Sequence, residues 1–280
     1  MPTSPASLHY IVAATPRSGS TLLCELLKGS GVAGRPNEDF QALRSTSRSR
    51  QPRQYFEGVE GAFLDRLAPT DPGQTETPAE FAAALAQSLE AGTTPNGVYG
   101  TKVMWGYFDQ LGQRLATRPG LAKASLPEAL ERTFPNLHFI QIQRRDKVAQ
   151  AVSLWTAVQT QTWRDEGERK GPEPEVFYDF AAIDHLVKLQ TSHEENWTHW
   201  LARHDFPVFT VVYEELANAP RTGVGKVLEW LDVPGGEDAV VPEPRMRKQS
   251  NGRSAEWAQR YRDERGGQVS AGGGRRLWRR

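Results

Sequence analysis

A short segment near the N-terminus, residues 15–21 with the sequence TPRSGST, constrains the fold of this chain more than any other feature. It follows an apolar run at residues 10–14 and precedes a helix-like run at residues 22–28. A strand, then a turn rich in Gly, Ser and Thr, then a helix directs free backbone N–H groups and a helix dipole toward an anion. We therefore predict a phosphate-binding turn at the end of a strand.

The turn departs in one place from the loop that binds nucleoside triphosphates, G-x-x-x-x-G-K-[ST]. Where that loop has a Lys after its last glycine, this chain has Ser20. Without the Lys, a β/γ-phosphate pair loses its fixed cation, but a single 5′-phosphate that carries a less charged group still fits. We interpret the turn as a cradle for a 5′-phosphosulfate. Its expected ligands are Arg17, Ser18, Gly19, Ser20 and Thr21.

Composition excludes several classes of protein. The 280 residues carry equal numbers of acidic and basic side chains, so the formal net charge gives no general attraction to nucleic acid or to anionic membranes. The single cysteine, Cys24, excludes an internal disulfide and is typical of a reducing compartment. We find no signal-peptide pattern and no apolar run of the roughly 18 residues that a membrane span needs. We expect a cytoplasmic protein without stable membrane insertion.

Strand-like and helix-like segments alternate along the chain, which favours a single α/β domain with a central parallel sheet flanked by helices. We predict strands at residues 10–14, 98–104, 137–142 and 207–212. We predict helices at 22–28, 79–91, 127–133, 147–163, 180–203 and 222–231. The domain is expected to span residues 1–265, with a mobile loop at 166–174 and a disordered Gly/Arg-rich tail at 266–280.

A second phosphate site is indicated by Arg144 and Ser153. Arg144 follows the strand expected at 137–142, and Ser153 lies in the first turns of the next helix. In an open α/β sheet, ligands bind at the carboxyl ends of the strands, so both side chains should face the crevice of the phosphate turn. Arginine suits a phosphate because its guanidinium can donate two parallel hydrogen bonds. Two separate phosphate sites suggest a nucleotide phosphorylated at both ends of its ribose.

Together with the sequence VVYEEL at 211–216, these residues resemble sulfotransferases, the P-loop-like enzymes that use 3′-phosphoadenosine 5′-phosphosulfate (PAPS). A closer resemblance is to the bacterial trehalose 2-sulfotransferases, and it extends in order and spacing from about Tyr10 to Arg262. The segments that carry it include TPRSGSTLL at 15–23, GVAG at 31–34, Glu38 with Phe40 and Gln41, QPR at 51–53, PNGV at 95–98, Lys102 with MW at 104–105, QAVS at 150–153, AVQT at 157–160 and RS at 253–254 with EW at 256–257.

The resemblance implies a role for each matching position. It implies that residues 17–21 bind the 5′-phosphosulfate and that Arg144 and Ser153 bind the 3′-phosphate. It implies that Glu38 is the general base. Lys248 and Arg253 fall in the C-terminal segment that closes over the nucleotide in such enzymes. The acceptor, trehalose or a related glycan or glycolipid, is expected to contact Arg35, Gln41, Arg53, Lys102 and Trp105.

A carboxylate at position 38 also has a physical reason. A sugar hydroxyl is a poor nucleophile, and a carboxylate that accepts its proton during in-line attack raises the rate by a factor of about 10²–10⁴. Asp39, the next residue, is the alternative base. A sulfuryl group carries less charge than a phosphoryl group, so cationic side chains can replace Mg²⁺. The six histidines show no metal-ligand spacing, and we expect no metal cofactor.

One position departs from the resemblance. The trehalose enzymes have a Glu before the proline of a Gly-Glu-Pro segment, and this chain has Arg35 before Pro36. The reversed charge would either change the acceptor or supply a cation for an anionic one. Two other functions stay open: a nucleoside or sugar kinase with a degenerate phosphate loop, and a non-catalytic nucleotide-binding relative. The resemblance further implies a homodimer whose partner subunit helps to form the acceptor site.

Overall fold

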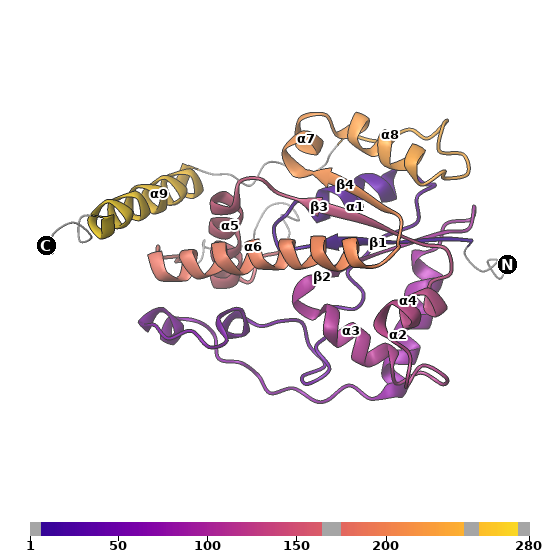
Figure 1. Ribbon diagram of the computed structural model, residues 1–280, viewed down its shortest axis with the longest axis horizontal. Helices are drawn as coiled ribbons and strands as arrows, with labels where there is room; N and C mark the ends of the chain where they lie inside the picture. Colours follow the sequence, from indigo (N-terminus) through magenta and orange to yellow (C-terminus); the bar gives the residue numbers. More distant parts are fainter. Residues whose placement is uncertain (1–6, 164–174, 244–251, 274–280) are drawn as a thin grey trace, which may run out of the picture.

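The computed structural model describes residues 7–163, 175–243 and 252–273, without the side chains of 268–273. Parallel strands form a central four-stranded sheet in the order β2-β1-β3-β4 (Figure 1). The strands are β1 (Leu8–Ala14), β2 (Val98–Met104), β3 (Leu137–Gln143) and β4 (Val208–Val212). Every residue of β1 and β2 is buried, as expected for strands that are covered on both faces. The predicted parallel sheet is confirmed.

Helices connect the strands and cover the sheet. Figure 1 shows α1, α7 and α8 toward the β4 edge, α2, α3 and α4 toward the β2 edge, and the long α6 along one face. The α-helices are α1 (Ser20–Gly29), α2 (Pro78–Gly92), α3 (Phe108–Leu115), α4 (Leu126–Thr133), α5 (Lys147–Thr160), α6 (Phe180–Arg203), α7 (Tyr213–Asn218), α8 (Pro220–Trp230) and α9 (Gly252–Gly273). The short 3₁₀-helices are η1 (Pro52–Phe56), η2 (Ala62–Arg66) and η3 (Trp105–Tyr107).

The predicted elements agree closely with the observed ones, with differences that have local causes. Helix α5 ends at Thr160 instead of residue 163, because Gln161 adopts the left-handed conformation with a φ of 54°. Helices α3, α7 and α9 were not predicted. The segment from residue 266, predicted as a disordered tail, overlaps α9, which extends to Gly273. The loop predicted at 166–174 lies outside the described residues.

The strand order fixes where a ligand can bind. The chain passes from β1 to β2 on one side and later continues in β3 on the other side of β1. Ala14, the last residue of β1, is level with Met104 at the end of β2. The helices that follow neighbouring strands diverge at such a point, which leaves a crevice at the carboxyl ends of the strands. The phosphate turn therefore begins at the centre of this edge.

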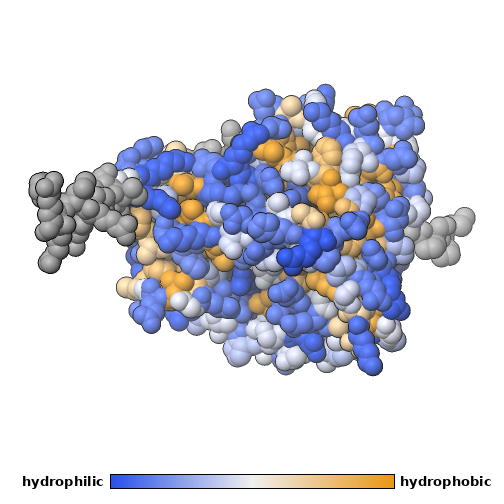
Figure 2. Space-filling model, in the orientation of Figure 1, coloured by the Kyte–Doolittle hydropathy of each residue, from blue (hydrophilic) through white to orange (hydrophobic). Residues whose placement is uncertain are grey.

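Two hydrophobic clusters pack around this edge. The larger cluster encloses the sheet, and the second lies between α5, α6, α9 and the segment that contains η1 and η2. Trp155 is fully buried at its centre and packs edge-on against Phe56 and Phe63. Tyr261 of α9 belongs to the same cluster, so α9 packs onto the domain. Figure 2 shows mainly hydrophilic residues on the outer face in view, with small separate hydrophobic areas.

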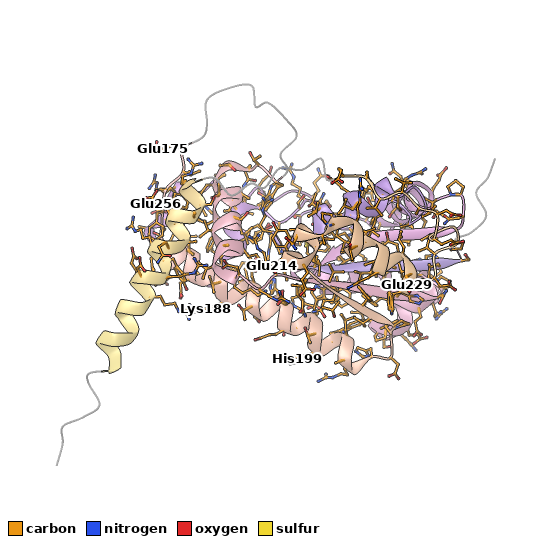
Figure 3. The ribbon with its side chains drawn as sticks, turned by 90° about the horizontal axis from the view of Figure 1, so that it is seen from above. Glu175, Lys188, His199, Glu214, Glu229 and Glu256 are labelled. Carbon is orange, nitrogen blue, oxygen red and sulfur yellow. The ribbon has the colours of Figure 1, made fainter. Side chains whose placement is uncertain are left out.

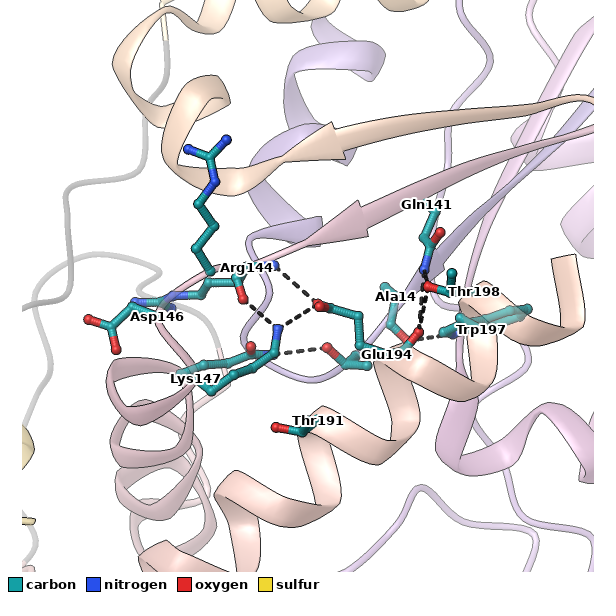
Figure 4. A network of polar contacts seen from close by, with 12 residues as sticks. Ala14, Gln141, Arg144, Asp146, Lys147, Thr191, Glu194, Trp197 and Thr198 are labelled. Carbon is teal, nitrogen blue, oxygen red and sulfur yellow. Dashed lines mark hydrogen bonds and ion pairs between the residues drawn. The ribbon is translucent and has the colours of Figure 1, made fainter. Parts of the chain in front are cut away.

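Hydrogen bonds hold helix α6 against the sheet near the ends of β1 and β3 (Figure 4). The indole N–H of Trp197 donates to the carbonyl of Ala14 at 2.9 Å. The amide of Gln141 donates to Oγ1 of Thr198 at 2.8 Å. One turn earlier, Glu194 accepts the backbone N–H of Arg144 at 3.2 Å. The residues of α6 that precede Glu194 therefore extend beyond the carboxyl edge of the sheet.

Candidate active site

The predicted phosphate turn connects β1 to α1. Gly19 caps α1 in the left-handed conformation, with a φ of 92°. A Cβ at this position would lie 2.2 Å from Cδ2 of Tyr213, so only glycine fits. Ser18 is fully buried, and its Oγ has no hydrogen-bond partner within the part of the chain that the structure describes. Ser18 does not line the cavity described below, whereas Arg17, Gly19, Ser20 and Thr21 do, and the N-terminus of the ten-residue α1 is suited to an anion.

Arg17 joins the turn to α5. Its Nε donates to Oγ of Ser153 at 2.9 Å, and its Nη1 donates to the carbonyl of Trp163 at 2.7 Å. Burial, and then the charge of Arg144, lower the pKa of Arg17. Two guanidinium groups that destabilise each other's charge are both stabilised when an anion binds beside them. The structure thus brings the residues predicted for the two phosphates into direct contact.

Arg144 lies directly after β3. Its Nη1 donates to the carbonyl of Arg17 at 2.9 Å, and its guanidinium lies 4.7 Å from the centre of the Tyr213 ring. Its Nε is buried and has no partner among the described residues. Glu194 accepts both the backbone N–H of Arg144 and, at 2.7 Å, the ammonium of Lys147 (Figure 4). The end of β3 is therefore held in place while part of the guanidinium is left for a ligand.

A cavity of about 1520 Å³ lies at the carboxyl edge of the sheet. It is larger than the roughly 300–1,000 Å³ of a pocket for one small molecule, so a nucleotide and an acceptor can both fit. Its walls come from α1, the segment at 37–55, α5, α6 and α9. The predicted site residues that line it are Arg17, Gly19, Ser20, Thr21, Glu38, Gln41, Lys102, Arg144 and Ser153.

Glu38 presents a carboxylate to this cavity. Its Oε2 pairs with Nζ of Lys102 at 2.8 Å, and its Oε1 accepts a hydrogen bond from the hydroxyl of Tyr107 at 3.2 Å. The Lys102 side chain is only 5% exposed, whereas that of Glu38 is 22% exposed. Burial, and then the charge of Glu38, raise the pKa of Tyr107, so its hydroxyl remains a donor. Lys102, which we predicted as an acceptor ligand, is the ionic partner of the predicted base.

The alternative base, Asp39, also lines the cavity but has a different environment. It is exposed, and its Oδ2 accepts a hydrogen bond from Oγ of Ser88 at 2.7 Å. The same Ser88 hydroxyl contacts the hydroxyl of Tyr99 at 2.7 Å. Asp39 is thus engaged with α2 and the sheet, and Glu38 is the carboxylate held by a buried cation.

Three predicted acceptor residues do not line the cavity. Arg35 is exposed, and its Nη1 donates to a main-chain carbonyl near the end of α2 at 3.5 Å. Arg53 donates from Nε and Nη2 to the carbonyl of Leu67 at 3.3 and 3.2 Å. Trp105 packs edge-on against Trp197, with ring centres 5.2 Å apart. None of these three side chains faces the cavity.

The predicted C-terminal residues are only partly described. Lys248 lies outside the described residues. Arg253 lies in the first turn of α9, next to Ser254, which lines the cavity. Further along α9, Arg262 donates to both carboxylate oxygens of Asp146, at 2.8 and 2.9 Å. Because Asp146 caps α5, this pair fixes α9 as one wall of the cavity.

Among the cavity-lining residues that sequence reasoning missed are Arg50, Tyr55, Gln190 and His193. Arg50 lies in a polar stretch with several other arginines, and no local pattern separates it from them. Gln190 and His193 belong to α6, whose register on the sheet depends on contacts with distant residues. A helical wheel of α6 would have placed them on the stripe that contains Trp197.

Within the described ranges, no three or more His, Cys, Asp or Glu side chains come together in a way that could hold a metal ion. Among the described helices, none is long and apolar enough to cross a bilayer.

The chain is similar to several known proteins. A trehalose 2-sulfotransferase of Mycobacterium tuberculosis is 39% identical over 259 residues, which cover 91% of this chain and 94% of that protein. A trehalose 2-sulfotransferase of Mycolicibacterium smegmatis is 38% identical, covering 90% of this chain and 94% of that protein. Among solved structures, a sulfotransferase from Alicyclobacillus acidocaldarius is similar with a TM-score of 0.46 and 15% identity, covering 97% of this chain and 98% of that chain.

The family model described as Stf0 sulphotransferase matches residues 9–264, from β1 into α9. The match contains the phosphate turn, Glu38 and Arg144. All residues that line the cavity, from Pro16 to Arg262, lie within this match. This chain belongs to the Stf0 sulphotransferase family of enzymes.

Proposed function

We propose that this sulfotransferase transfers a sulfuryl group from PAPS to a hydroxyl group of trehalose or of a related glycan or glycolipid. One observation carries the proposal: a single cavity contains both the arginine-rich anion site and the carboxylate of Glu38. The names of the two relatives support the acceptor, because both are trehalose 2-sulfotransferases.

The residues of the anion site fit the donor. Arg144 lines the cavity, and its Nε is buried without a partner among the described residues, so it can donate to an anionic oxygen. Gly19 caps α1, whose first free backbone N–H groups can also donate to an anion. In this proposal the turn binds the 5′-phosphosulfate, and Arg144 with Ser153 binds the 3′-phosphate. The bound donor supplies the sulfuryl group and a stable leaving group.

Glu38 then acts as the base. The acceptor oxygen forms a bond to sulfur while the bond from sulfur to the bridging phosphate oxygen breaks. The hydroxyl proton passes to the carboxylate of Glu38, and adenosine 3′,5′-bisphosphate leaves. Lys102 and Tyr107 hold the carboxylate in place, and Arg17 stabilises the charge that develops on the bridging oxygen.

An acceptor screen tests the proposal. The protein is incubated with PAPS in the presence of EDTA and with trehalose, glucose or a glycolipid, and the products are identified by mass spectrometry. We expect a sulfated sugar whose formation needs PAPS and no divalent metal. Phosphorylated products that need ATP and Mg²⁺ would support the kinase alternative. Tight binding of the nucleotide without any product from a broad set of acceptors would support a non-catalytic relative.

We also propose that the enzyme is a homodimer, as the family resemblance implies. Arg35 and Arg53 do not line the cavity of their own chain, so a partner subunit is where they could meet an acceptor. Sedimentation equilibrium of the purified protein tests the proposal: a mass of one chain across the micromolar range would contradict it.

A further inference from the structure

Helix α6 presents a polar group to the cavity that the proposed chemistry does not use. Gln190 is 1% exposed, yet it lines the cavity. Neither its Nε2 nor its Oε1 has a hydrogen-bond partner in the described part of the chain. Leaving a buried polar group without a hydrogen-bond partner destabilises the folded protein. Such a group, facing a cavity, indicates a ligand that both donates and accepts hydrogen bonds.

Two further polar side chains lie near Gln190 on the same wall. His193 follows it by one helical turn, and Arg50 lies close to both His193 and Gly106. A Cβ built at Gly106 would lie 2.9 Å from Nη1 of Arg50 and 3.5 Å from Cε1 of His193. Nε of Arg50 is buried and has no partner within the described residues. The three side chains come from α6 and from the segment before η1, and all line the cavity.

This group borders the predicted base. Gly106 precedes Tyr107, whose hydroxyl donates to Glu38 at 3.2 Å. The guanidinium of Arg50 lies 5.4 Å from the centre of the Tyr55 ring. Burial raises the pKa of Tyr55, and the charges of Arg50, Glu38 and Arg17 all act on its hydroxyl. Tyr55, which also lines the cavity, is therefore near the anion site and the base.

We propose that Gln190, His193 and Arg50 form the subsite that binds hydroxyl groups of the acceptor next to Glu38. The inference rests on the proposed function. A sugar hydroxyl donates one hydrogen bond and accepts others, which matches the amide of Gln190 and a neutral imidazole. Burial, with Arg50, lowers the pKa of His193 to about 4, so the ring is neutral at pH 7.

The amide of Gln190 and the neutral ring of His193 can each donate and accept, as a sugar hydroxyl does. The guanidinium of Arg50 can donate to a sugar oxygen from its buried Nε. We therefore expect a polyhydroxylated acceptor such as trehalose.

The test compares the variants Gln190→Leu and His193→Asn with the wild type, with thermal unfolding used to select folded proteins. We expect the KM for the acceptor to rise at least tenfold in each variant. The KM for PAPS and the calorimetric affinity for adenosine 3′,5′-bisphosphate should stay unchanged. The matched control is His199→Asn, because His199 lies on the outer side of α6, away from the sheet (Figure 3).

The outcomes separate the two proposals. If the wild type does not transfer sulfuryl groups to any hydroxylated acceptor, the proposed function fails. If the wild type is active and both variants keep the wild-type KM for the acceptor, the subsite is contradicted. A loss of affinity for the bisphosphate would instead assign these side chains to the donor and would also overturn the subsite.

Discussion

Neighbouring residues of the same chemical type can differ in function when their contacts differ, and the carboxylates of Glu38 and Asp39 are such a pair. Glu38 is held by a buried ammonium and a tyrosine hydroxyl, whereas Asp39 is exposed and bonded to Ser88. We predict that Glu38→Gln lowers kcat by about 10²-fold or more, because the amide cannot accept a proton. The affinity for adenosine 3′,5′-bisphosphate should change little. Steady-state kinetics and calorimetry measure both quantities.

The control is Asp39→Asn, measured under the same conditions after circular dichroism has verified its fold. We expect it to keep kcat within a few-fold of the wild type. A large loss in Asp39→Asn beside an active Glu38→Gln would move the base to Asp39. If both variants keep wild-type turnover, neither carboxylate is the base.

His193 gives a prediction about stability. Burial, and then the charges of Arg50 and His185, lower its pKa from 6.5 to about 4. The unfolded chain therefore binds a proton between these pH values that the folded protein does not. Above pH 6.5, His193 is neutral in both the folded and the unfolded chain, and it does not reduce the free energy of unfolding. As the pH falls from 6.5 toward 4, protonation of His193 in the unfolded chain lowers that free energy by at most about 3 kcal/mol. Urea unfolding at pH 7.5 and pH 4.5 should show a smaller loss in His193→Asn than in the wild type, and an equal loss would contradict the assignment.

At the scale of elements, the phosphate turn depends on Gly19, which has a left-handed backbone conformation and packs directly against the Tyr213 ring. We predict that Gly19→Ala weakens binding of adenosine 3′,5′-bisphosphate at least tenfold and destabilises the fold by about 1–3 kcal/mol. The cause is the Tyr213 ring, 2.2 Å from the new Cβ. Gly31→Ala is the control, because Gly31 also has a positive φ but no atom within 4 Å of its Cβ. Equal effects of both variants on nucleotide affinity would disprove the role of the Tyr213 contact.

The sequence predicts some elements well because their signals are local. The strands are apolar runs between turns, and α6 has its predicted bounds because Asp179 caps it and its apolar stripe continues to Leu201. Helix α7 follows β4 without any intervening turn, so the sequence gives no boundary between them. Helix α9 is stabilised by pairs such as Arg260 with Glu264 and by packing of Tyr261, which composition alone does not reveal.

At the scale of the whole molecule, the cavity assembles from segments far apart in the sequence. The phosphate turn could be predicted, since a short motif encodes it. The contact between Arg17 and Ser153 joins residues 136 positions apart in the sequence, and its existence follows only from the neighbouring positions of β1 and β3. Arg50 and Gln190 meet the cavity through the packing of η1 and α6. Tertiary contacts, rather than residue type, therefore determine which polar side chains become part of the site.

The central claim is that this cavity recognises a nucleotide with separate 5′- and 3′-phosphates. Calorimetry of the wild type and of Arg144→Ala with adenosine 3′,5′-bisphosphate, AMP and ATP tests it most directly. Arg145→Ala is the matched control, because Arg145 is exposed and pairs with Glu215. We predict that the wild type binds the bisphosphate far more tightly than AMP or ATP. Arg144→Ala should lose most of the preference over AMP, a charge-assisted contact of about 1.5–3 kcal/mol, while the control keeps it. Equal affinities of the wild type for AMP and the bisphosphate would contradict the account.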